Sequence, residues 1–245
     1  MKTIPPLALI ATLALILAGC TTYIPPGAKA DLQAFAPASI QDGFAAKPSN
    51  PFPASIAAVR VQSPTYSSFY LRQNGGKYGS GRYSIITNRE VGEDAQFDRI
   101  AAAPQVSGLV ALNRMLLPER LEGDREIREA AARLQADMVF LYTFDTAFID
   151  SDASRPLTVI TLGLSPTRKI TAVTTVSALL LDTRTGYVYS AYEITERQAT
   201  LSSSWGSSET ADKARRETEN RAFIRLVDEF IDSWPRLVQS GVQRT

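Results

Sequence analysis

Few side chains in this sequence have the type and spacing that catalysis requires. Asp145, Asp150 and Asp152 form a short acidic cluster, and grouped carboxylates can bind calcium or carry out acid–base catalysis. Their spacing lacks the glycine and the terminal glutamate of a calcium-binding loop. A solvated loop at the end of a strand is therefore the favoured interpretation. An enzyme that uses carboxylates such as Asp145 and Asp150 remains the weakest of three functional hypotheses.

The sequence contains no histidine and a single cysteine, Cys20. The absence of histidine excludes Ser-His-Asp and Cys-His mechanisms, histidine metal ligands and the commonest general base. Because Cys20 is assigned to a different role below, thiol catalysis and structural disulfides are excluded as well. We therefore expect a protein that is not an enzyme, with no cofactor and no metal site.

An aromatic and basic stretch over residues 64–83 is the main candidate for partner binding. Its centre, Asn74-Gly75-Gly76, favours a hairpin turn because these residues accept positive φ. Aromatic rings beside basic side chains can stack on sugars, peptides or bases. The alternative is a mobile hairpin whose tyrosines only cover a sheet edge. The candidate partner contacts, all expected on loops, are Tyr66, Tyr70, Tyr78 and Trp205.

Composition is that of an ordinary globular protein. The chain is 44% hydrophobic and 21% charged, with a formal net charge of +1. Acidic and basic residues alternate through the C-terminal half, so there is no electrostatic argument for a nucleic-acid partner. The glycines of residues 75–81 do not match a phosphate-binding loop, which needs Gly-Lys-Ser/Thr at the start of a helix.

The N-terminal stretch has the three parts of an export signal. Lys2 supplies the positive charge, Leu7 to Leu17 forms an apolar core, and the stretch ends in Leu17-Ala18-Gly19-Cys20. This ending resembles the lipobox of bacterial lipoproteins. The resemblance implies that residues 1–19 are a signal peptide, that Cys20 carries three acyl chains, and that these anchor the protein in a membrane. Two or more acyl chains hold a protein stably, whereas one binds reversibly.

Two other interpretations of this stretch were weighed. A transmembrane helix needs about 20 apolar residues, but Pro5 and Pro6 precede this core and only residues 4–19 are free of charge. An ordinary secretory signal would leave Cys20 as an unpaired thiol in an oxidising compartment, which is unusual. Thr21, rather than Asp, follows the cysteine. In the lipoprotein family this implies transport to the outer membrane, with the chain on the periplasmic face.

Residues 20–54 are predicted to form a proline-rich tether, and residues 55–245 a single α/β domain. Proline-rich segments rise about 3.1 Å per residue, so the tether would reach at most on the order of 100 Å. The alternative is a partly ordered strap on the domain, because four apolar residues are available to pack. These are Leu32, Phe35, Ile40 and Phe44.

The remaining chain alternates between strand and helix patterns. Strands are predicted at residues 56–61, 83–88, 106–112, 137–146, 157–164, 170–181 and 187–196. Helices are predicted at residues 93–103 and 124–135 and from Ser208 onward, each from apolar residues at helical spacing. The strand at 137–146 is apolar throughout, which indicates burial on both faces. Pro235 is expected to end or kink the last helix.

The order of elements from residue 120 to residue 232, including the turn Asp182-Thr183-x-Thr185-Gly186-x-Val188, is similar to that of a group of envelope lipoproteins. The group includes the curli-secretion lipoprotein CsgG, PelC and LpoB, whose periplasmic domain resembles an anticodon-binding domain. The resemblance implies an α/β (α+β) sandwich in which a mixed, mainly antiparallel sheet packs against helices. It also implies a non-enzymatic protein that forms secretion rings, assists export or activates a partner enzyme.

The favoured function is therefore an accessory module that docks on an envelope protein or polysaccharide. The second hypothesis is a homo-oligomeric ring component of a secretion or export system. The curli-secretion pore crosses the membrane through long amphipathic hairpins, and each transmembrane strand needs about 9 to 11 alternating residues. The segments available here, 147–168 and 199–208, are too short or too polar for two such hairpins. Channel formation is thus not expected.

Overall fold

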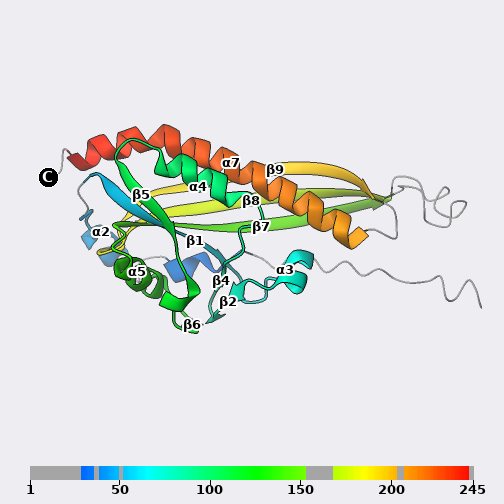
Figure 1. Cartoon of the computed structure of the whole chain (residues 1–245), viewed down its shortest axis with the longest axis horizontal. Coiled ribbons are helices and arrows are strands. Elements are labelled where there is room, and N and C mark those ends of the chain that lie inside the picture. The colour runs from blue at the N-terminus through cyan, green and yellow to red at the C-terminus, as the bar shows by residue number, and fades with distance from the viewer. Residues whose placement is uncertain (1–28, 36–38, 50–51, 153–167, 203–206, 243–245) are drawn as a thin grey trace, which may run out of the picture.

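A sheet of seven strands organises the molecule (Figure 1). The computed structural model describes residues 29–35, 39–49, 52–152, 168–202 and 207–242. The strand order is β2-β4-β1-β7-β8-β9, and β5 also pairs with β1. The strands are β1 (Ala54–Gln62), β2 (Lys77–Tyr78), β4 (Ser84–Ile86), β5 (Val106–Ala111), β7 (Met138–Asp152), β8 (Arg168–Asp182) and β9 (Val188–Ser202).

The three longest strands form an antiparallel meander in which β8 pairs with β7 on one side and with β9 on the other. The turn from β8 to β9 closes with a hydrogen bond of 2.9 Å from the Gly186 amide to the Asp182 carbonyl oxygen. Gly186 has φ +70°, a conformation that side chains disfavour. The predicted turn at residues 182–186 is confirmed, and β7 is buried from Met138 to Phe144, as its apolar sequence indicates.

Strand β1 joins two parts of the sheet. Along one edge it pairs in parallel with β7 from Ile56 to Arg60. The opposite edge is shared, because β5 pairs in parallel with Ala54–Ala58 and β4 pairs antiparallel with Arg60–Gln62. A separate two-stranded sheet contains β3 (Ser80–Gly81) and β6 (Arg120–Leu121).

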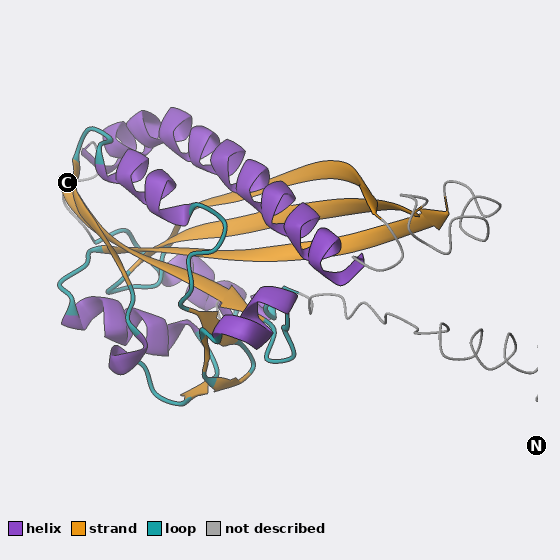
Figure 2. Ribbon diagram, turned by 45° about the vertical axis from the view of Figure 1, so that its right-hand side comes forward, coloured by secondary structure: helices purple, strands orange, loops and turns teal. Residues whose placement is uncertain are grey.

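Helices cover one face of the sheet through α7 (Ser207–Val242) and α4 (Glu93–Ala101) (Figure 2). The apolar stripe of α7 packs on residues of β7 and β8 that share one face by strand alternation. The largest buried members of this core are Phe140, Tyr142, Phe144, Phe223, Phe230 and Trp234. Pro235 lies inside α7, which continues to Val242. The helix therefore does not end at Pro235, and the alternative expectation, a kink at this residue, stays a prediction.

A second, smaller core lies on the opposite face, under α5 (Asp124–Arg133) and the 3-10 helix η1 (Leu32–Phe35). Phe35 packs on Tyr83, with 4.9 Å between ring centroids, and the Ala30 amide donates to the Thr143 hydroxyl at 3.2 Å. Residues 29–35 are thus a strap on the domain, and the extended-tether interpretation does not hold for them. Helix α2 (Ile40–Ala45) by contrast exposes Ile40 and Phe44.

The predicted class, a mixed and mainly antiparallel sheet packed against helices, is confirmed. The hairpin predicted at residues 64–83 is wrong. In its place Ser68 caps α3 (Phe69–Asn74), accepting a 3.1 Å hydrogen bond from the Leu71 amide, and Gly75 ends the helix. The glycines therefore serve as a helix C-cap instead of a strand-to-strand turn. The remaining short helix is η2 (Arg114–Leu116). The signal peptide, Cys20 and the strand predicted at residues 157–164 lie outside the described residues.

Candidate partner-binding surface

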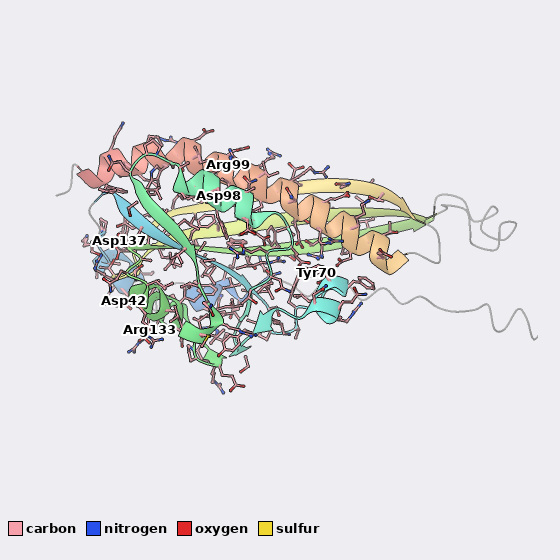
Figure 3. The ribbon with its side chains drawn as sticks, viewed as in Figure 1. Asp42, Tyr70, Asp98, Arg99, Arg133 and Asp137 are labelled. Carbon is pink, nitrogen blue, oxygen red and sulfur yellow. The ribbon has the colours of Figure 1, made fainter. Side chains whose placement is uncertain are left out.

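The tyrosines predicted as partner contacts do not form one surface. Tyr66 is 2% exposed and belongs to the interior. Tyr70 is half-buried on α3, with the Arg216 guanidinium 5.7 Å from its ring centroid (Figure 3). Tyr78 is half-buried and donates a 3.1 Å hydrogen bond to the Leu117 carbonyl oxygen. Trp205 lies outside the described residues. The prediction that Tyr66 contacts a partner from an exposed loop is wrong, because its hydroxyl is needed inside the molecule.

Tyr66 contributes its hydroxyl to a buried charge cluster between β1 and α7. The hydroxyl accepts hydrogen bonds from Arg60 at 3.0 Å and from Arg215 at 3.3 Å. Arg215 also contacts Glu219 at 2.6 Å and Glu90 at 2.9 Å. The other ion pairs of the cluster are Arg215–Asp212 at 3.1 Å, Arg60–Glu219 at 3.4 Å, Arg60–Glu93 at 3.5 Å and Arg60–Glu90 at 3.6 Å.

The electrostatics of this cluster are those of a closed structural unit. Burial raises the pKa of Glu93 and of Glu219, although the neighbouring arginines oppose that shift. Buried carboxylates with raised pKa values are common in catalytic sites. Here, however, the side chains of Arg60, Glu90, Glu93, Arg215 and Glu219 are at most 1% exposed. Solvent hardly reaches these side chains, so we interpret the cluster as a clamp between β1, α4 and α7.

Part of the buried charge cluster could have been predicted from the sequence. Asp212, Arg215 and Glu219 are spaced by three and four residues, which places them on one side of a helix. Arg60 is the one charged residue of the largely apolar strand β1, and a charged side chain in a buried strand requires a partner. The pairing of Arg60 with Glu219, 159 positions away, depends on the tertiary fold, so sequence spacing does not predict it.

A second polar centre attaches residues 47–49 to the end of β8. Both Asp182 carboxylate oxygens accept hydrogen bonds from Ser49, and one also accepts from the Tyr189 hydroxyl at 3.0 Å. The Arg184 and Thr185 amides donate to Asp182 at 2.9 and 3.0 Å. Burial raises the pKa of Asp182, but these donors outweigh burial and lower it below the ordinary value of 3.8. Asp182 is thus an ionised anchor for residues 47–49 and for the turn between β8 and β9.

The contribution of Asp182 to stability is expected to depend on pH. Because its pKa is lower in the folded state, this contribution is complete above pH 3.8 and is lost as the pH falls through the folded-state pKa. Asp182→Asn is expected to cost about 2 kcal/mol at pH 7, the size of a hydrogen bond to a charged group. Urea unfolding at pH 7 and at pH 3 should show a smaller cost at pH 3. Asp232→Asn, at an exposed position on α7, is the control, and an equal cost at both pH values would contradict the prediction.

The long strands leave much of one sheet face open. Even-numbered residues of β8 from Ala172 to Leu180 point toward α7 and are buried, and Tyr192 of β9 is buried in the same core. Residues such as Thr175, Ala191 and Ala199 point to the opposite face and are partly or fully exposed. On that face η1 and α5 pack near the ends of the strands at Met138 and Asp182 (Figure 1). Among the described residues, no other helix covers the rest of this face.

An apolar groove of about 420 Å³ lies where η1 meets this open face. We call it the strap groove. One wall is formed by Leu32 and Phe35 of η1, and the floor by strand residues. Those floor residues are Leu141, Ser177, Ala178, Leu179, Val188, Ala191, Tyr192 and Glu193. Ser177 and Glu193 hydrogen bond to each other at 3.1 Å at its polar end. The sequence did not predict this groove, because it forms only when the strap packs on the sheet.

No metal centre is apparent in the described part of the chain, where no group of three or more Cys, Asp or Glu residues is arranged to hold an ion. Asp145, Asp150 and Asp152 all lie on β7, so the interpretation of this acidic cluster as a loop is wrong. Asp145 is half-buried, and the side chains of Asp150 and Asp152 lie outside the described residues. Among the described helices, none combines the length and apolarity needed to cross a membrane.

No protein-family model and no curated protein matches the chain. Protein XCC0632 from Xanthomonas campestris, of family DUF330, is a similar solved structure with 12% identity and a TM-score of 0.36, over 81% of this chain and 91% of that one. A neuraminyllactose-binding hemagglutinin homolog from Helicobacter pylori has 9% identity and a TM-score of 0.35, over 81% and 95%. Protein CT253 from Chlamydia trachomatis has 11% identity and a TM-score of 0.32, over 73% of this chain and 95% of that one. These similarities are weak.

Proposed function

We propose that this protein is a non-catalytic, lipid-anchored accessory module on the periplasmic face of the outer membrane, which captures an apolar segment of an envelope protein in the strap groove. The observation that carries the proposal is the groove itself, which is lined mainly by apolar side chains. Covering apolar surface removes it from water, and this stabilises the complex with the partner. A polysaccharide fits this groove less well, because its hydroxyls would lose water without gaining hydrogen bonds.

The position of the strap supports the same proposal. Lys29, the first residue described, lies nine positions after Cys20. A chain of that length spans at most about 30 Å. Acylation of Cys20 would therefore hold η1 and the strap groove close to the membrane surface, within reach of membrane-bound partners.

Two matched variants on β9 test this function. Ala191 and Ala199 are both exposed alanines on the open face, but only Ala191 lines the strap groove. Ala191→Glu places a charge in the groove and is expected to reduce partner capture from detergent-solubilised envelopes at least tenfold, which corresponds to about 1.4 kcal/mol. Ala199→Glu should leave capture unchanged. Equal capture by both variants, measured by quantitative mass spectrometry, would contradict the proposal.

Cys20→Ser separates anchoring from docking. The variant should leave the membrane fraction while it retains capture of the purified partner. A Cys20→Ser protein that stays in the membrane fraction would contradict lipid anchoring, without bearing on the groove.

The open edge of β9 favours a second candidate, a ring component. In the described part of the chain β9 is the last strand of the sheet, so its outer edge is not paired with another strand. Unpaired edges can pair with other chains, and a head-to-tail interface can close into a ring. The mass of the full-length lipoprotein in mild detergent, from light scattering, separates the candidates, because a closed ring of many copies would favour this second function.

A further inference from the structure

We propose that a second site, the pocket where β4 and β5 separate along β1, binds the carboxylate or phosphate group of a small organic anion. We call it the fork pocket. It has a volume of about 450 Å³, within the usual range for small-molecule sites and larger than a bare ion requires. It is distinct from the strap groove, and the proposal does not depend on the function proposed above.

The topology explains why a pocket forms there. Ala111 of β5 is opposite Ala58, and Ile86 of β4 is opposite Arg60, so the C-terminal ends of both strands meet beside Val59. Beyond this point β4 leads into Thr87 and β5 leads into Leu112, and the two segments separate. Crevices outside the carboxyl ends of strands, where neighbouring strands diverge, are recurrent ligand sites in α/β sheets. Residues of both hydrophobic cores line the fork pocket, which therefore penetrates the sheet.

Tyr142 marks the floor of the fork pocket. It lines the pocket and is 2% exposed, and within the described chain its hydroxyl makes no hydrogen bond. Buried tyrosine hydroxyls usually have a partner. Burial raises the pKa of Tyr142 well above its ordinary value. The hydroxyl therefore stays protonated and can donate a hydrogen bond to an acceptor in the pocket. The Tyr142 hydroxyl is therefore a donor available to an acceptor that enters the pocket.

The mouth of the pocket adds further donors. Arg114 is exposed and has no ion-pair partner among the described residues. Asn113 uses its side-chain oxygen to accept from the Met115 amide at 3.0 Å, which leaves its NH2 group free to donate. Arg89 also lines the mouth, although it pairs with Asp94 at 2.8 Å. A guanidinium together with amide and hydroxyl donors is suited to carboxylate or phosphate oxygens.

The charge of the lining supports an anion over a cation. The charged residues that line the fork pocket are Arg60, Arg89 and Arg114, and no aspartate or glutamate lines it. Arg60 is already neutralised by Glu90, Glu93 and Glu219 of the buried charge cluster. The attraction for an anion therefore comes mainly from Arg114 at the mouth, and the Tyr142 hydroxyl fixes the orientation of the bound group.

Titration calorimetry on the full-length lipoprotein in mild detergent tests the proposal, with inorganic phosphate and citrate as probes and glucose as the neutral comparison. Saturable binding of phosphate or citrate, but not of glucose, is expected. Arg114→Gln and Tyr142→Phe should each weaken binding about tenfold, the loss of one charge-assisted hydrogen bond. Arg236→Gln removes an equal charge from an exposed position on α7 outside the pocket, and should bind like the wild type.

Tyr142→Phe is informative because it removes only an oxygen that makes no intramolecular hydrogen bond. Its thermal stability should equal or exceed that of the wild type, so weaker binding in this variant cannot be attributed to unfolding. The proposal is overturned if neither anion binds saturably, if glucose binds as well as citrate, or if Arg114→Gln and Tyr142→Phe both bind like Arg236→Gln.

Discussion

Arg215→Met is expected to lower the free energy of unfolding by about 3 to 5 kcal/mol, the cost of breaking a buried ion pair from one side. Arg215 contacts Glu219, Glu90 and Asp212, and its side chain is fully buried. Methionine fills a similar space but carries no charge. The variant therefore leaves three carboxylates with Arg60 and the partly exposed Arg216 as their neighbouring cations, inside a region that water does not reach.

Urea unfolding followed by circular dichroism measures this loss. The matched control is Arg216→Met, the adjacent residue on α7, whose side chain is 37% exposed, forms an ion pair with Asp212 at 3.3 Å and lies over the Tyr70 ring. The control is expected to cost less than about 1 kcal/mol, as exposed ion pairs do. Similar costs for the two variants would contradict the interpretation of the buried charge cluster as a structural clamp.

Phe223→Ala is expected to cost about 3 to 5 kcal/mol, as truncation of a buried aromatic residue usually does. Phe223 has no solvent exposure and lies at the centre of an aromatic group that joins α7, α4 and β7. Its ring centroid is 4.7 Å from that of Tyr142, 6.0 Å from Phe144 and 6.2 Å from Phe97. Alanine would leave a cavity where these three elements of the larger core meet.

Phe44→Ala is the control for this change, because Phe44 on α2 is 80% exposed. It removes the same atoms from a position that buries little surface, and is expected to change stability by less than about 0.5 kcal/mol. Thermal and urea unfolding of both variants give the comparison. A loss below about 1 kcal/mol in Phe223→Ala would show that α7 is not packed on β7 as described.

The regular elements were predictable because their patterns repeat over many residues. Alternation along residues 170–181, and apolar positions at helical spacing in α5 and α7, record which face is buried. The turn at Gly186 was predictable for a similar local reason, since its positive φ favours glycine. These features depend on near neighbours in the chain.

The features that were missed depend on distant neighbours. Tyr66 looks like an exposed loop residue in sequence, yet its hydroxyl is enclosed by Arg60 and Arg215. The glycines after Asn74 suit a hairpin and a helix cap equally well, and only the packing of Leu71 beside Tyr66 and Ile86 distinguishes them. Pro235 is tolerated within α7 because its side chain is exposed and the turns on both sides pack on the sheet.

Site-specific photo-cross-linking in living cells tests the central claim most directly. A benzophenone amino acid is placed at position 191 in the strap groove or at position 199 on the same strand and face, with Cys20 intact. The account predicts a discrete cross-linked product with one envelope protein from position 191 and none from position 199. No product from position 191, or the same products from both positions, would contradict the claim that the strap groove is where this protein meets its partner.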